Sequence, residues 1–396
     1  MTKRIAVFGA GAIGSVVGGM LARAGHDVTL IDQWPEHVEA MKARGLRLSG
    51  TIGDFVVPVR ALHVHELQTV GEPFDAVFVA VKSYDTEWAT AMALPYLREP
   101  DGVVVDFQNG INDERVAAVA GKHRSLGCVI TISAGMYEPG HALRTDTAAV
   151  GFKIGEHDGT DSPRARELAA LLGAVAEAKV TTNLWGERWS KLAINCMANP
   201  LAGLTGLSTL EVRTVPEIAA VGVHLGAEAI AVGRAVGHEV EPIYGIAVQR
   251  YADAYAGRGL PELLAEIAAV ARARGGGQPS LLQDVLKGRR TEIDHLNGYV
   301  CREGSRVGVK TPFNDAVVTA VRALGVGFKP DPAHLDPVIR MLPDSVARAR
   351  RPAALTVGAT ALWSACRCIP GMRERAAEVR RAARRRGGAP GGPRGG

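Results

Sequence analysis

Short apolar runs alternate with longer amphipathic stretches along the first half of the chain. Four runs are almost continuously apolar, at residues 4–8, 28–31, 75–81 and 103–107. Such runs are expected of parallel strands buried on both faces, and residues 12–24 and 85–98 between them have helical composition. This alternation predicts an α/β fold with a Rossmann-type doubly wound sheet. Residues 46–59 and 125–154 are richer in strand formers, so we expect mixed or antiparallel strands at the end of the sheet.

Strand signals stop at about residue 181, and the second half of the chain is predicted to be helical. The expected helices cover residues 185–210, 216–236, 261–272, 280–287, 292–303 and 312–324. We therefore expect two domains: a dinucleotide-binding Rossmann domain over residues 1–180 and an all-helical substrate and catalytic domain over residues 181–330. The length of 396 residues agrees with two domains and a tail.

The positive charge of the chain is concentrated at one end. The net charge is +5, but 12 Arg and three acidic residues follow Leu342, so residues 1–342 carry a net charge of −4. A mildly acidic body does not favour a nucleic-acid surface. Residues 343–396 are basic and of low complexity, and we expect this tail to be disordered.

Composition favours a cytoplasmic globular protein. Apolar residues make up 47% of the chain, enough to bury sizeable cores. The five cysteines have no paired spacing, which favours a reducing cytoplasm over a secreted disulfide scaffold. Residues 5–22 resemble the start of a signal peptide, but four glycines within residues 9–18 fit a strand, turn and helix better. The apolar stretch 353–366 is too short to span a bilayer, so no membrane partner is expected.

A glycine-rich turn follows the first predicted strand. Its residues are Gly9, Ala10, Gly11, Ala12, Ile13 and Gly14, a G-x-G-x-x-G sequence that leads into a helix. The first glycine permits a tight turn, the second lets the backbone approach a pyrophosphate, and the third lets helix and strand pack closely. The start of the helix offers N–H groups and a positive dipole end to phosphates. This context predicts a bound dinucleotide cofactor.

Asp32 indicates which dinucleotide is preferred. It ends the second predicted strand, 18 residues after Gly14, where a carboxylate can bind the ribose hydroxyls and would repel a 2′-phosphate. Residues 33–36 contain no cation to offset this charge. NAD(H) is therefore favoured over NADP(H). The alternative is that Asp32 caps the helix that begins near Pro35.

Three polar residues recur at every fourth position of a largely apolar predicted helix, namely Lys191, Asn195 and Asn199. Steps of four place them on one stripe of that helix. Burial of a cation and two amides is costly unless each finds a partner, and a ligand would supply partners. A solvated helix face is the alternative. We expect Pro200 to kink or end the helix directly after Asn199.

Other candidates are less distinctive by themselves. Ser280 could be a helix N-cap, and Glu292 could compensate a helix dipole in a first turn. Asn109 stands between Gln and Gly in a common turn sequence, but it also follows a strand directly, where ligands bind in open α/β folds. His63 and His65 have no evident third ligand, so no metal is predicted. No cysteine has a motif for nucleophilic catalysis.

Together, these segments resemble the ketopantoate reductase (2-dehydropantoate 2-reductase) family over about residues 4–330. The segments are the glycine-rich turn, Val81-Lys82, Gln108-Asn109-Gly110, Lys191-x-x-x-Asn195-x-x-x-Asn199-Pro200, and Ser280-x-x-x-Gln283-Asp284 leading to Thr291-Glu292-Ile293-Asp294. The resemblance implies an N-terminal Rossmann domain, a helical C-terminal domain and a catalytic cleft between them.

The resemblance also implies a role for each residue. Lys191 would be the general acid, and Glu292 would support it or the substrate. Lys82 would lie near the adenosine end of the cofactor. The residues that would orient substrate and nicotinamide are Asn109, Asn195, Asn199 and Ser280. Reduction of a 2-oxo acid places negative charge on the carbonyl oxygen, which an ammonium can stabilise and protonate. Burial would lower the pKa of Lys191, and Glu292 would raise it.

Three positions depart from the family pattern. Gly277 and Thr209 stand where family members often carry Asn residues that hold the pantoate hydroxyl, and Asp32 stands near the usual Arg of an NADP(H) site. We expect NAD(P)H-dependent reduction of a 2-oxo acid, with 2-dehydropantoate of pantothenate biosynthesis as the first candidate substrate. The alternatives are an NAD-dependent 2-hydroxyacid dehydrogenase of another pathway and a non-catalytic NAD(H) sensor that uses the Arg-rich tail. A homodimer is left open.

Overall fold

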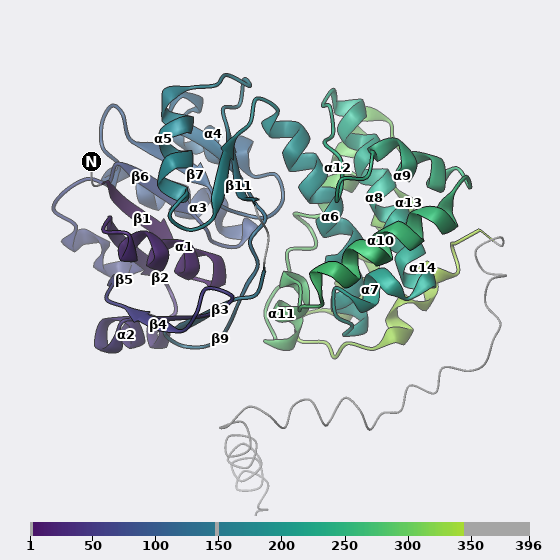
Figure 1. Cartoon of the computed structure of the whole chain (residues 1–396), viewed down its shortest axis with the longest axis horizontal. Coiled ribbons are helices and arrows are strands. Elements are labelled where there is room, and N and C mark those ends of the chain that lie inside the picture. Colours follow the sequence, from purple (N-terminus) through teal and green to yellow (C-terminus); the bar gives the residue numbers. More distant parts are fainter. Residues whose placement is uncertain (1–2, 147–149, 344–396) are drawn as a thin grey trace, which may run out of the picture. The chain divides into compact units, whose positions relative to one another are not determined.

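Strands from the first 180 residues form a mixed eight-stranded sheet (Figure 1). The computed structural model describes residues 3–146 and 150–343. In spatial order the strands are β12 (Glu177–Val180), β11 (Val150–Gly155), β8 (Ser125–Ile130), β7 (Val103–Asp106), β6 (Ala76–Val79), β1 (Arg4–Phe8), β2 (Asp27–Asp32) and β5 (Arg60–His63). Neighbours are parallel except β8 with β11. The order β5-β2-β1-β6-β7-β8 is that of a doubly wound dinucleotide-binding sheet, which confirms the predicted fold and its mixed edge.

Strand β1 illustrates why these runs are apolar. Ile5 and Val7 pack into one hydrophobic cluster, whereas Ala6 and Phe8 pack into another. Successive side chains of a strand point to opposite faces, so a strand covered on both sides needs apolar residues throughout. The helices of this part are α1 (Ala12–Arg23), α2 (Pro35–Arg44), α3 (Thr86–Ala93), α4 (Asp113–Ala120) and α5 (Pro163–Leu172).

A smaller four-stranded sheet accompanies the large one. Its order is β4 (Phe55–Val57), β3 (Leu46–Gly50), β10 (His141–Arg144) and β9 (Ala134–Glu138), with β3 and β10 parallel and the other pairs antiparallel. Five 3₁₀ helices are also present among the described residues: η1 (Val64–Thr69), η2 (Ser83–Asp85), η3 (Leu94–Tyr96), η4 (Lys122–Arg124) and η5 (Pro332–Leu335). The four strands of the small sheet, together with β8 and most of β11, fall within the two strand-rich stretches expected from the sequence. Only β8 and β11 extend the large sheet, whereas the other four form the separate sheet that the sequence did not predict.

From Leu184 onward, the described residues form helices and their connecting loops, drawn in teal to yellow-green in Figure 1. The helices are α6 (Leu184–Thr205), α7 (Glu211–Thr214), α8 (Pro216–Val236), α9 (Val248–Tyr255), α10 (Leu260–Arg274), α11 (Ser280–Leu286), α12 (Asn297–Val307), α13 (Pro312–Leu324) and α14 (Asp336–Ile339). We call residues 3–180 the sheet region and residues 184–343 the helical region. All described residues belong to one compact unit.

Helix α8 is a core helix of the helical region. It is the one described helix long and apolar enough to cross a membrane, but 83% of that stretch is buried inside the protein. Glycines let it approach α6 closely, because a Cβ atom on Gly226 would lie 2.7 Å from the side chain of Met197. Its composition therefore reflects burial against neighbouring helices.

Two helices differ at one end from the expectation: α6 does not end at Pro200, and α12 begins later than predicted. Helix α6 continues through Pro200 to Thr205 instead of ending after Asn199. Proline removes the N–H group that would bond the Cys196 carbonyl four residues earlier. That carbonyl accepts a hydrogen bond from Asn297 Nδ2 at 3.5 Å instead. Asn297 is the first residue of α12, so this helix starts five residues later than predicted and leaves Glu292 in the preceding loop.

The parallel strands bring four predicted site residues to one edge of the sheet. Gly9 follows β1, Asp32 ends β2, Lys82 follows β6, and Asn109 follows β7. This is the carboxyl edge, where ligands bind in open α/β sheets. Residues 344–396, which include most of the predicted disordered tail and the apolar stretch 353–366, lie outside the described residues.

Candidate active site

The glycine-rich turn has the geometry that a dinucleotide requires. Gly9 has φ +96°, and a Cβ atom there would lie 2.7 Å from the Ala80 backbone. A Cβ atom on Gly14 would lie 2.1 Å from the Gly9 carbonyl oxygen, so α1 packs tightly on β1. A Cβ atom on Gly11 would face open space, and α1 begins directly after it without a side-chain cap. The turn thus fits a pyrophosphate at the start of α1.

Asp32 makes a local hydrogen bond at the end of β2. Its Oδ1 atom accepts a hydrogen bond from the Trp34 N–H at 2.9 Å. The N-cap position of α2 is occupied by Trp34, so Asp32 shapes the turn into the helix without being the cap itself. The bond uses one of the two carboxylate oxygens, which leaves the other for a ribose hydroxyl.

A basic loop of the helical region contacts aromatic rings of the sheet region. This basic loop comprises residues 287–290, and its three cations lie over three rings. The pairs are Lys287 with Tyr137 at 5.6 Å, Arg289 with Trp34 at 5.6 Å and Arg290 with Tyr84 at 4.7 Å from the ring centre. Arg289 therefore brings a cation to the turn after Asp32 from a distant part of the chain. Residues 33–36 give no sign of Arg289, because this cation comes from a distant part of the chain.

Half-buried Lys82 forms an ion pair with buried Glu292. Lys82 Nζ lies 3.0 Å from Glu292 Oε2, 2.6 Å from Asp284 Oδ2 and 3.3 Å from Ser280 Oγ. The backbone N–H and the hydroxyl of Ser83 both donate to Glu292 Oε1. Burial opposes both charges, but Glu292 and Asp284 raise the pKa of Lys82, and Lys82 and Ser83 lower the pKa of Glu292. Lys82 thus joins residues that the resemblance assigned to substrate and catalysis.

Ser280 is not a helix N-cap, and Glu292 does not lie in the first turn of a helix. Ser280 is the first residue of α11, and Pro279 occupies the N-cap position. Glu292 lies in the loop before α12 and cannot compensate a helix dipole in a first turn. Its side chain is instead buried against Lys82 and Ser83.

Lys191 lies on α6 and has no counter-ion. Its ammonium makes no hydrogen bond or ion pair with residues 3–146 or 150–343. Burial, together with the charges of Arg213 and Arg274, lowers the pKa of Lys191 to about 8, and Asp146 opposes them. The expectation that Glu292 raises this pKa is therefore wrong, because Glu292 is engaged by Lys82.

Two asparagines extend the stripe of α6 that begins with Lys191. Asn195 and Asn199 are both buried. Asn195 Nδ2 donates to Asn109 Oδ1 at 3.3 Å, which connects α6 to the loop after β7. The solvated-face alternative is therefore wrong for these two amides. The hydrogen bond places the middle of α6 at the carboxyl edge of the sheet.

Arg188 fixes the start of α6 to the same edge, and sequence reasoning missed it. Its guanidinium donates to Asp106 Oδ2 at 2.9 Å and to Asp113 Oδ1 at 2.7 Å, and all three side chains are buried. It also donates to the Gln108 carbonyl at 3.3 Å. Burial raises the pKa of Asp106 to about 8, with Arg188 opposing. The ion pairs hold Lys191, three residues further along α6, at a fixed position relative to the strand ends.

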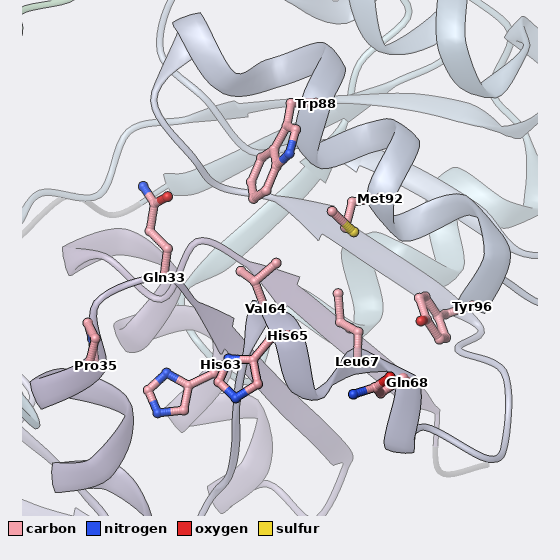
Figure 2. A pocket seen from close by; sticks show the side chains of 10 residues that line it. All are labelled: Gln33, Pro35, His63, Val64, His65, Leu67, Gln68, Trp88, Met92 and Tyr96. Carbon is pink, nitrogen blue, oxygen red and sulfur yellow. The ribbon is translucent and has the colours of Figure 1, made fainter.

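A surface cavity of about 800 Å³ lies beyond β5 and is distinct from these residues. Figure 2 shows His63 and His65 on one side of it and Trp88 and Met92 on the other. The two imidazole rings stack at 5.2 Å, and His63 Nε2 lies 2.9 Å from Glu39 Oε1. No group of three potential metal ligands occurs within the described part of the chain. Of the residues near Asp32, Gln33 and Pro35 line this cavity.

Comparison with known proteins gives a consistent result. The family model described as "Ketopantoate reductase PanE/ApbA" matches residues 5–159, and its C-terminal counterpart matches residues 183–325. A 2-dehydropantoate 2-reductase of Archaeoglobus fulgidus is 29% identical over 329 residues, which cover 82% of this chain and 99% of that protein.

Comparison with solved structures agrees with this result. The crystal structure of a PanE/ApbA family ketopantoate reductase from Ralstonia eutropha JMP134 is 30% identical, with a TM-score of 0.66, and the match covers 81% of this chain and 97% of that one. A D-mandelate dehydrogenase with NADH and anilino(oxo)acetate shares the fold, with a TM-score of 0.69 at 24% identity over 81% of this chain and 97% of that one.

Proposed function

We propose, since this chain belongs to the ketopantoate reductase family of oxidoreductases acting on CH–OH groups, that it reduces a 2-oxo acid to the 2-hydroxy acid with NAD(P)H in the cytoplasm. The first candidate substrate is 2-dehydropantoate, which relatives of this chain are named for. The observation that carries the proposal is a half-buried ammonium, at Lys191, that has no counter-ion among the described residues and lies on a helix attached to the carboxyl edge of a dinucleotide-binding sheet.

Lys191 is the proposed general acid. A nicotinamide, when bound, supplies the hydride. As negative charge develops on the substrate carbonyl oxygen, the ammonium of Lys191 stabilises that charge and donates a proton to it. A pKa of about 8 suits this task, because the side chain is still protonated at neutral pH but gives up its proton more readily than an ordinary lysine.

Glu292 and Lys82 have a proposed positioning role. Their ion pair, with Ser280 and Asp284, ties α11 and the loop before α12 to the strand end after β6. Asn109, Asn195 and Ser280 offer amide and hydroxyl groups that can orient the substrate. Because Glu292 already accepts four hydrogen bonds, we assign it to holding the site together rather than to proton transfer.

For the cofactor, we propose a preference for NADH that Asp32 imposes and Arg289 moderates. The Asp32 carboxylate accepts from Trp34 and keeps one oxygen for a ribose hydroxyl. Its charge repels a 2′-phosphate. Arg289, over the Trp34 ring, partly offsets this charge and permits some use of NADPH. The role of Lys82 at the adenosine end remains a prediction from the family resemblance.

Two departures from the family pattern bear on which substituent the substrate carries. Thr209 and Gly277, two of the three departures from the family pattern, bond each other: the Gly277 N–H donates to Thr209 Oγ1, and the Thr209 N–H donates to the Gly277 carbonyl, both at 2.9 Å. Neither of these two residues carries a side-chain amide to hold a hydroxyl. This observation favours the second candidate, a 2-hydroxyacid dehydrogenase that takes a different 2-oxo acid.

A panel of 2-oxo acids, followed by the absorbance of NADH and NADPH, tests the proposal. We expect turnover of at least one branched 2-oxo acid, and Lys191→Ala should lower its rate by about 10²-fold or more while NADH binding persists. Arg272→Gln, a charge change on an exposed part of α10, serves as control. Unchanged turnover in Lys191→Ala would remove this residue from the mechanism, and no turnover of any 2-oxo acid would favour the NAD(H) sensor.

A further inference from the structure

Two arginines converge on one tyrosine in the helical region. The guanidinium carbon of Arg213 lies 5.1 Å from the ring centre of Tyr244, and that of Arg274 lies 5.0 Å from it. Arg213 belongs to α7, Arg274 ends α10, and Tyr244 lies in the loop between α8 and α9. Neither guanidinium forms an ion pair within residues 3–146 or 150–343. Two like charges are thus held near one ring with no carboxylate of the described chain to balance them.

Polar atoms in this cluster lack partners. The Nε atom of Arg213 and the hydroxyl of Tyr244 are both buried, and neither has a hydrogen-bond partner. An unsatisfied buried donor is costly, and such groups are rare in folded proteins. Arg213 is half-buried, whereas Arg274 is exposed and keeps its N–H groups open to a ligand. The cluster therefore has the chemistry of a site that a ligand completes.

The backbone of Tyr244 is held in an uncommon conformation. It has φ +57°, the one positive value at a non-glycine residue in the described chain, and Gly245 follows with φ +81°. Ile243 and Ile246 exchange two backbone hydrogen bonds around them, at 3.0 and 2.9 Å. Such two-residue turns favour Asn-Gly, because a bulky side chain is strained there. Strain of this kind persists where a side chain must be held in place, and here it directs the tyrosine ring toward the two arginines.

A hydrogen bond connects the loop that carries Tyr244 to the helix that carries Lys191. The charges of Arg213 and Arg274 act on the Lys191 ammonium and lower its pKa. Ser190 Oγ, beside Lys191 in the sequence, donates to the Pro242 carbonyl at 3.3 Å and so ties α6 to the loop that carries Tyr244. The paired Thr209 and Gly277 draw together the segments that lead to Arg213 and follow Arg274.

We propose that Arg213, Tyr244 and Arg274 form a carboxylate-binding site that anchors the substrate beside Lys191. Two guanidinium groups and a phenol hydroxyl supply donors, and guanidinium suits a carboxylate because its planar N–H groups can bond both oxygens. The carboxylate is either the one adjacent to the reacting carbonyl or a second acidic group on the substrate. This inference rests on the proposed reduction of a 2-oxo acid and adds how that acid is held.

Calorimetry of oxamate binding to the full-length chain, with NADH present, tests the site. Oxamate is a 2-oxo acid analogue that is not reduced. Arg274→Gln should weaken oxamate binding by about tenfold or more, and Tyr244→Phe by a smaller factor, while NADH binding stays within about twofold. Arg272→Gln on the same helix is the matched control and should bind oxamate as the wild type does. Thermal melts report whether each variant is folded. Unchanged oxamate binding in both Arg274→Gln and Tyr244→Phe, or a wild type that does not bind oxamate, would overturn the proposal.

Two substrates distinguish the origin of the carboxylate. The ratio kcat/KM is measured for monocarboxylic 2-oxoisovalerate and dicarboxylic 2-oxoglutarate. An equal loss on both in Arg274→Gln assigns the site to the carboxylate beside the carbonyl, and a loss confined to 2-oxoglutarate assigns it to a second acidic group. No loss on either overturns the site. A wild type that reduces neither these nor any other 2-oxo acid would contradict the proposed function itself, which separates the two failures.

Discussion

Arg188 and Lys191 are cations on the same helix, three residues apart, and the fold treats their charges in opposite ways. Arg188 is buried against two acidic side chains, those of Asp106 and Asp113, and forms an ion pair with each. Lys191 is half-buried, has no ion-pair partner in the described chain and is close enough to Arg213 and Arg274 for their charges to lower its pKa. The first arrangement builds the scaffold, and the second leaves a charge available to a ligand. The comparison teaches that ion-pair partners distinguish a structural cation from one that can take part in chemistry.

Removal of Arg188 should have the largest effect. Arg188→Met leaves two buried acidic side chains, Asp106 and Asp113, without their cationic partner, so the free energy of unfolding should fall by about 3–5 kcal/mol. Chemical denaturation followed by circular dichroism measures this. Arg306→Met is the matched control, because Arg306 is exposed and pairs with Glu303 on the surface, and it should cost less than about 1 kcal/mol. Similar losses in both variants would mean that the buried ion pairs do not hold the scaffold.

Removal of Lys191 should separate activity from stability. Lys191→Met should lower the turnover of the 2-oxo acid by about 10²-fold, because the proton donor is lost. Its free energy of unfolding should stay the same or rise, because a half-buried cation without an ion pair in the described chain is replaced by an apolar side chain of similar length. A loss of stability as large as that of Arg188→Met would place Lys191 among the structural cations.

The two cations should also differ in how stability depends on pH. The pKa of Lys191 is about 8 in the folded protein, below its unfolded value, so folding disfavours the protonated form. The free energy of unfolding should therefore contain a penalty at neutral pH that is relieved as pH rises from about 8 toward the unfolded pKa. Urea denaturation at pH 7 and pH 9.5, compared between wild type and Lys191→Met, measures this contribution. An identical pH dependence in both proteins would show that Lys191 titrates normally.

Removal of the charge at Asp32 should have the smallest effect among these substitutions. Asp32→Asn keeps an acceptor for the Trp34 N–H but removes the negative charge, so it should shift the ratio of NADPH to NADH affinity by about tenfold toward NADPH. Fluorescence titration with both cofactors measures the ratio. A wild type that already prefers NADPH would contradict the assigned role of Asp32.

Neighbouring residues in the sequence were sufficient to predict the fold and part of the site. The run at Arg4–Phe8 and the glycine spacing of residues 9–14 specify a strand, a turn and a helix from neighbouring residues alone, and helices α8 and α13 begin and end where predicted. Asn195 was a sound candidate because an amide on an apolar helix stripe needs a partner, and it has one in Asn109.

Long-range contacts account for what sequence could not supply. The helix continues through Pro200 because Asn297, 97 residues later, bonds the freed carbonyl. Glu292 is bound by Lys82 from the other half of the chain, so its expected effect on Lys191 was wrong. Arg213 and Arg274 reach Tyr244 from separate helices, and no spacing in the sequence shows that they meet.

The pH dependence of turnover tests the central claim most directly, namely that Lys191 is a protonated donor with a lowered pKa. In the direction of 2-oxo acid reduction, kcat/KM of the wild type should fall with one proton above an apparent pKa near 8, and this limb should be absent from the residual activity of Lys191→Met. A wild-type rate that stays level to about pH 10, or an alkaline limb retained in Lys191→Met, would contradict the account.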